Sequence, residues 1–177
     1  MIQARSVMLA LLLFGSFVSC ATAQTVLRAD AVLRRFEGRW RTHFTIIKSA
    51  SMAPHVTETT GVGVGRVTLG GQYLEFRAKT DAMPGSQVNE DLQVSTWDAA
   101  DKVYRHWLFD SEGNRFERTG TLDNVHHTLT WRANELGGEV VIHDRFVSDD
   151  RIEWDLVRRD GVGKITMRID AWMTRLP

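Results

Sequence analysis

Histidine is the residue type in this chain best suited to proton transfer or metal binding, because its pKa lies close to neutrality. Six histidines are present. His126 and His127 are adjacent, so in a strand their rings point to opposite faces and do not hold one ion together. No His-x-His or His-Glu-x-x-His spacing occurs, and the single cysteine is Cys20 near the N-terminus. The sequence therefore predicts no metal or haem site, since such a site would need ligands from several strands.

Two further patterns bear on catalysis and on nucleotide binding. The serine nucleophile of an α/β-hydrolase lies in a Gly-x-Ser-x-Gly elbow, which this chain lacks. Gly61, Gly63 and Gly65 precede Arg66 and have the composition of a phosphate-binding loop. Such a loop needs a helix directly after it, whereas the residues that follow are typical of a strand. We therefore assign no catalytic residue and no cofactor, and we expect these glycines to permit a bend or close approach in a sheet.

Charged residues inside two β-rich segments are the remaining candidates for chemistry. They are His143, Asp144 and Arg145 in one segment and Asp155 in another. Directed inward, they would form the polar end of a cavity or an acid-base pair. Directed outward, they would form cross-strand salt bridges on a solvated face, which is the interpretation that we favour.

Six tryptophans indicate an aromatic interior for a chain of this length. In several segments large apolar residues occupy alternate positions, as in a strand with one buried face. A barrel of about eight or more strands leaves room for one small ligand among such residues, although a filled core would use the same residues. The candidate ligand-binding residues are Phe76, Trp107, Phe109, Trp131, Trp154 and Met167.

Short strands are expected to carry these residues. Residues 25–36 have the apolar spacing of a short helix, and after Gly38 the apolar period becomes two. Turn-forming residues separate the later segments, and their short links indicate an antiparallel meander. Closing it as an up-and-down barrel of about 8–10 strands removes exposed edges, and a two-sheet sandwich is the alternative. The expected strands are 39–47, 56–68, 72–79, 91–98, 103–110, 115–121, 128–133, 139–147, 151–158 and 164–174.

Several pieces of sequence resemble a known family in their order along the chain. Gly38-Arg39-Trp40, after a helix, is similar to the Gly-x-Trp entry of lipocalins. A wider set of pieces resembles DUF1579, a bacterial family of lipocalin-like proteins of unknown function. They are Arg35–Trp40, Leu69–Glu75, Trp97-Asp98 with Tyr104, Phe109–Asn114 and Gly120–Asp123. The resemblance implies an all-β, lipocalin-like (calycin-type) barrel with a short N-terminal helix, and it implies no catalytic residue.

The similarity to lipocalins also implies how the barrel closes. With an even strand count the first and last strands pair antiparallel, which places Trp40 beside Trp172–Arg175. Lipocalins commonly cover this tryptophan with a basic side chain from the last strand, and Arg175 occupies that position here. A guanidinium over an indole face is favourable by roughly 0.5–2 kcal/mol. A frayed C-terminus with Arg175 in solvent is the alternative.

The N-terminus has the three parts of a secretory signal peptide. Arg5 precedes the apolar run Val7–Val18, which is too short to span a bilayer, and Ala21-Thr22-Ala23 provides a cleavage site. We expect residues 1–23 to be removed and 24–177 to form one domain, periplasmic or secreted and not transmembrane. The alternative is a lipoprotein anchored through Cys20, whose preceding residues loosely match a lipobox.

The composition of the chain excludes some classes of binding partner. The formal net charge is zero at pH 7, which argues against a nucleic-acid partner. We expect an exported barrel that binds a small apolar or amphipathic molecule, and the sequence assigns no oligomeric state. The alternatives are a cofactor-free barrel enzyme, such as a cyclase, isomerase or hydratase, and a structural envelope protein with a filled core. The state of the interior distinguishes these hypotheses.

Overall fold

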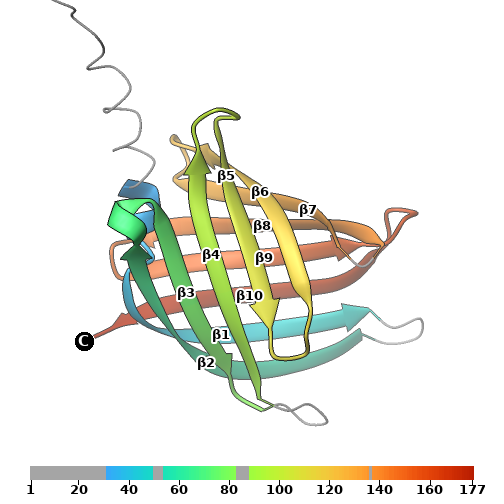
Figure 1. Ribbon diagram of the computed structural model, residues 1–177. Coiled ribbons are helices and arrows are strands. Elements are labelled where there is room, and N and C mark those ends of the chain that lie inside the picture. The colour runs from blue at the N-terminus through green and yellow to red at the C-terminus, as the bar shows by residue number, and fades with distance from the viewer. Residues whose placement is uncertain (1–30, 50–53, 83–87, 136) are drawn as a thin grey trace, which may run out of the picture.

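The computed structural model describes residues 31–49, 54–82, 88–135 and 137–177 (Figure 1). The expected signal peptide, Cys20 and the first residues of the expected N-terminal helix lie outside these ranges. The last part of that helix is present, because residues 31–34 are helical and lead into a turn at 35–36. A second short helical element, the 3-10 turn η1, spans Leu69–Gly71.

Ten antiparallel strands form one closed barrel, in which each strand pairs with its neighbours in sequence and β1 pairs with β10. The predicted barrel is therefore confirmed, and the sandwich alternative is wrong. Each expected strand corresponds to an observed one, with bounds that differ by a few residues. The strands are β1 (Gly38–Ser49), β2 (Pro54–Thr68), β3 (Tyr73–Thr80), β4 (Asn89–Asp98), β5 (Val103–Asp110), β6 (Arg115–Asp123), β7 (Thr128–Glu135), β8 (Gly138–Ser148), β9 (Arg151–Arg159) and β10 (Ile165–Leu176).

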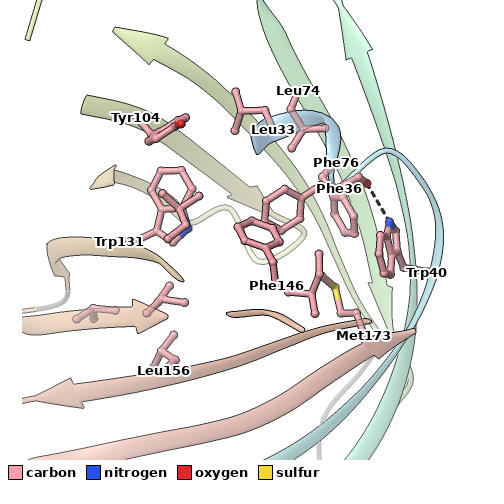
Figure 2. Close-up of a cluster of buried hydrophobic side chains, with 14 residues drawn as sticks. Leu33, Phe36, Trp40, Leu74, Phe76, Tyr104, Trp131, Phe146, Leu156 and Met173 are labelled. Carbon is pink, nitrogen blue, oxygen red and sulfur yellow. Dashed lines mark hydrogen bonds between the residues drawn. The ribbon is translucent and has the colours of Figure 1, made fainter. Parts of the chain in front are cut away.

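The N-terminal helical segment covers one end of the barrel. Leu33 and Phe36 are buried there, and the Phe36 ring packs edge-to-face on Phe146 with centroids 5.4 Å apart. Trp40 is fully buried, and its indole Nε1 donates to the Phe36 carbonyl at 2.9 Å, as Figure 2 shows. This hydrogen bond satisfies the polar atom that burial of a tryptophan would otherwise leave unpaired.

Arg175 closes the same end from the last strand. Trp40 and Arg175 face each other across the β1–β10 pair, and the guanidinium carbon lies 4.3 Å from the centroid of the indole ring. The guanidinium also donates to the carbonyls of Arg35, Glu37 and Asp149. The expected contact is therefore present, and it joins the last strand to the helical segment.

Two of the three glycines on β2 allow close approaches at this end. A Cβ at Gly65 would collide with the Phe36 carbonyl, and a Cβ at Gly63 would lie 2.5 Å from the edge of the Phe76 ring. No side chain is compatible with either position unless its neighbours move. The expected close approach is confirmed, because these glycines make room for the helical segment and for an inward phenylalanine.

Candidate functional site

The barrel interior contains a cavity of about 210 Å³. Its lining comes from strands all around the barrel and from the helical segment at the closed end. A filled interior is therefore not what this chain forms. The lining residues are Phe36, Thr42, Phe44, Leu74, Phe76, Ala78, Thr80, Asp91, Gln93, Ser95, His106, Leu108, Arg118, Trp131, Ile142, Asp144, Trp154, Leu156 and Met173.

One side of the cavity is mainly apolar. It is built by β1, β3, β9 and β10, which contribute Phe44, Phe76, Trp154, Leu156 and Met173. Phe44 and Trp154 pack edge-to-face with ring centroids 5.6 Å apart. These side chains alternate along their strands with outward residues, as the period-two pattern predicts. This side offers an apolar surface to the body of a ligand.

The opposite side is polar, and β4 shows why. Asp91, Gln93 and Ser95 of this strand line the cavity, whereas the residues between them, Leu92 and Val94, point away from it. The usual arrangement of apolar residues inside and polar residues outside is thus inverted. Apolar residues occupy both parities of this strand, so its sequence alone does not select the inward face. Gln93 donates to Asp91 at 2.8 Å, and the Ser95 hydroxyl is hydrogen-bonded to His106, so these inward groups partner one another and give the cavity a polar wall.

β5 shares this inversion, and it corrects the expectation for Trp107 and Phe109. The strand directs Tyr104, His106 and Leu108 inward, so Trp107 and Phe109 lie on the outer face, where Phe109 is 46% exposed. The register explains the orientation, because Trp97 pairs with Tyr104 across the turn and their rings pack at 4.9 Å. With Tyr104 inside, a period of two also directs the next alternate residues inward.

His106 is buried on the polar side. Its Nδ1 lies 3.0 Å from the hydroxyl oxygen of Ser95, and its Nε2 is buried with no hydrogen-bond partner in the part of the chain that the structure describes. Burial, together with the nearby positive charge of Arg118, lowers the pKa of the imidazole to about 3. His106 is therefore neutral at physiological pH, with one nitrogen unsatisfied.

Asp144 is the most perturbed acid of the cavity. Trp131 donates its indole N–H to Oδ2 of this carboxyl group at 2.7 Å. Burial nevertheless raises the pKa of Asp144 to about 6, because desolvation outweighs the hydrogen bond and the attraction of Arg118. Burial also raises the pKa of Asp91 on β4. Both carboxyl groups thus face the cavity in an environment that disfavours their charge.

Arg118 of β6 is the cation of this polar side, and it is already paired. Its guanidinium donates to Glu135 through two hydrogen bonds, Nε to Oε1 at 2.5 Å and Nη2 to Oε2 at 3.3 Å. Both side chains are about nine-tenths buried. The pair is held by geometry that matches the planar guanidinium to the carboxylate, and its charges largely cancel.

The charged segments of β8 and β9 divide between the two faces. His143 and Arg145 contact Asp155 on the outer face, at 3.0 Å and 2.6 Å, as the favoured interpretation predicted. Although partial burial opposes the change, these hydrogen bonds lower the pKa of Asp155. Asp144 departs from that interpretation because its parity directs it into the cavity, where it forms part of the polar side.

Of the expected ligand-binding residues, Phe76, Trp131 and Trp154 line the cavity, and Met167 instead packs against the buried cluster beside it. Their role as ligand contacts stays a prediction. Sequence reasoning missed the polar lining residues Asp91, His106, Arg118 and Asp144. The signal that indicates two of them is the pair of aromatics at the β4–β5 turn, Trp97 and Tyr104. Continuing their inward parity reaches Asp91 on β4 and His106 on β5.

Two negative findings apply to the described part of the chain. Among the residues with described positions, His, Cys, Asp and Glu side chains form no group of three suited to a metal ion. Within the same ranges, no helix has both the length and the apolar character required to cross a bilayer.

Comparison with known proteins supports the fold. No family model matches the chain, and no curated protein matches it, so the resemblance to DUF1579 stays a prediction. An S-type phycobiliprotein lyase from Guillardia theta has a similar structure, with a TM-score of 0.65 and 10% identity over 84% of this chain and 92% of that one. Protein Rv2717c from M. tuberculosis has a TM-score of 0.62 and 14% identity over 84% and 98% of the two chains. At such identities the likeness shows a shared lipocalin-like barrel.

Proposed function

We propose that this protein is an exported barrel that binds a small amphipathic molecule in its interior. The observation that carries the proposal is the cavity in the barrel interior, which has one apolar side and one polar side. Typical sites for small molecules combine an apolar lining with a few polar groups that orient the ligand. A volume of about 210 Å³ is below the range of drug-sized sites, which indicates a ligand smaller than those.

The polar side distinguishes this cavity from a packing defect. A defect in a core is lined by apolar groups, because burying an unsatisfied polar group costs about 1–3 kcal/mol. Here His106 keeps Nε2 without a partner among the described residues, and Asp144 remains buried although its charged form is disfavoured. A ligand that donates a hydrogen bond to Asp144 would offset the cost of burying this carboxyl group.

The test is to titrate the barrel with the neutral fluorophore 1-naphthol and follow tryptophan emission. Trp131 and Trp154 line the cavity, so an occupant there changes their emission. We expect saturable binding, and we expect Ala78→Phe, which places a ring inside the cavity, to abolish it. The matched control is Lys79→Phe, one residue along β3, where the side chain is exposed. Absence of saturable binding, or equal binding by both variants, would refute the proposal.

A cofactor-free enzyme is the second candidate, favoured by the convergence of two titratable groups. The Trp131 indole contacts both of them, with its centroid 5.0 Å from the His106 ring and its N–H bound to Asp144. A carboxyl group with a pKa near neutrality suits general acid-base chemistry. Native mass spectrometry of protein from its natural host would identify the retained molecule. Conversion of that molecule by the native protein but not by Asp144→Asn would establish an enzyme.

Export is part of the proposal. It rests on the sequence of residues 1–23, with cleavage between Ala23 and Gln24. N-terminal sequencing of the protein recovered from the cell envelope should begin at Gln24. Recovery of a chain that begins with a lipid-modified Cys20 would instead make the protein a membrane-anchored lipoprotein.

A further inference from the structure

The charges that line the cavity are predominantly acidic. Asp91 and Asp144 line it with one guanidinium, that of Arg118, and this cation is already bound by Glu135. Arg158, at an inward position of β9, also has an interaction partner. The cavity therefore presents two carboxyl groups whose pKa values are raised by burial, and the attraction of Arg118 does not reverse the rise in either.

The neighbouring groups are acceptors of hydrogen bonds or can act as acceptors. An ionised carboxylate accepts at two oxygens, and Trp131 Nε1 uses one position on Asp144. Neutral His106 accepts at Nε2 when its Nδ1 carries the proton and donates to Ser95. Asp91 already accepts from the Gln93 amide at 2.8 Å, whereas the buried Nε2 of His106 has no donor among the described residues.

We propose that the amphipathic ligand carries a basic nitrogen, as a primary alkylamine does, with its ammonium group at Asp144 and its apolar body against Phe76, Trp154 and Leu156. This inference rests on the ligand-binding function proposed above. A primary ammonium has three N–H donors and no acceptor, which matches a site rich in acceptors. It also supplies the positive charge that a buried carboxylate lacks.

A ligand with an anionic end does not fit the same site. Its charge would have to displace Glu135 from Arg118, which would leave a buried carboxylate without its partner. It would also face Asp91 and Asp144. A neutral alcohol would satisfy fewer acceptors and would leave the charge of Asp144 uncompensated. The site should therefore distinguish an amine, an alcohol and a carboxylate that carry alkyl groups of equal length.

The experiment measures binding of octylamine, octan-1-ol and octanoate to the mature protein by isothermal titration calorimetry at pH 7.5. We expect octylamine to bind at least about tenfold more tightly than octan-1-ol, since a hydrogen bond to a charged group exceeds a neutral one by that order. Asp144→Asn keeps the acceptor for Trp131 but removes the charge, and it should weaken octylamine binding about tenfold with octan-1-ol nearly unchanged. The matched control, Asp170→Asn on the partly exposed outer face of β10, should leave all three affinities unchanged.

The outcomes separate the two proposals. If none of the three molecules binds saturably, the ligand-binding function itself fails. If octan-1-ol or octanoate binds as tightly as octylamine, ligand binding stands and the basic-nitrogen inference is wrong. Equal loss of all three in Asp144→Asn would also overturn the inference, because Asp144 would then shape the cavity without recognising the ammonium.

Discussion

The closed end of the barrel and the polar side of its cavity both place charged groups beside aromatic rings, to opposite effect. At the closed end, Trp40 and Arg175 satisfy each other and the carbonyls around them. On the polar side, His106 keeps an unpartnered nitrogen and Asp144 keeps a raised pKa. The first region is arranged for stability. The second retains unfavourable groups, which is typical of a binding or catalytic site.

The largest expected effect is at the closed end. Trp40→Ala removes a fully buried ring together with its hydrogen bond and the surface on which Arg175 lies. We expect the free energy of unfolding to fall by about 3–5 kcal/mol, as for other large-to-small core truncations. Urea denaturation followed by circular dichroism measures it. A loss below about 1 kcal/mol would show that this end is not a stabilising closure.

The second-largest expected effect is at Asp144, whose contribution to folding stability depends on pH. Burial raises the pKa of its carboxyl group to about 6 in the folded state, against a reference value of 3.8. Between these values the native state holds a proton that the unfolded chain has released, so this group's contribution to stability is full at low pH and is lost as pH rises. We expect it to fall by about 2 kcal/mol from pH 4 to pH 7.

Asp144→Asn isolates this contribution from the other carboxyl groups. Denaturation curves at several pH values give the difference in unfolding free energy between the native protein and the variant. As pH rises, the unfolding free energy of the native protein should fall relative to that of Asp144→Asn. A difference independent of pH would mean that Asp144 titrates normally, and the contrast between the two regions would weaken.

Arg175→Ala should have a smaller effect than Trp40→Ala. The variant loses the cation–π contact and the hydrogen bonds to the carbonyls of Arg35 and Asp149, but it leaves the indole buried. We expect a loss of about 1–2 kcal/mol, because the contact is partly exposed. Thermal unfolding with Arg175→Lys as the control separates charge from shape. Equal losses in the two variants would indicate that the planar guanidinium is required.

The smallest effect should come from the outer face of the inverted strands. Phe109→Thr replaces an exposed ring on β5 with a residue that suits a strand. We expect a change within about 0.5 kcal/mol, as for most surface substitutions, and unchanged binding of 1-naphthol. Leu108→Thr, one residue away and facing the cavity, should change naphthol binding. The opposite result would place the binding surface outside the barrel.

Much of the architecture was predictable because it follows from local chemistry. Turn-forming residues and the period of two located all ten strands, and the Gly-x-Trp entry indicated where the first strand begins. An even strand count and antiparallel closure placed Trp40 beside Trp172–Arg175, and the resemblance to lipocalins selected Arg175 from that range. These features depend on neighbouring residues, or on one topological rule, and therefore need no coordinates.

The polar site could not be predicted in the same way. Trp107 and Phe109 were expected inside because apolar side chains usually are, yet the turn after Asp98 sets a register that directs His106 and Leu108 inward. A strand with apolar residues on both parities has two plausible orientations, and its hydrogen-bonded neighbours select one.

The sequence by itself therefore determined that this chain forms short antiparallel strands that close with Trp40 at one end. It did so because turns and alternation are local properties. Only the tertiary structure decided that Asp91, His106 and Asp144 share a cavity, since they lie on three different strands. The same burial that brings them together excludes water, and it is this desolvation that raises the pKa of Asp144 and lowers that of His106.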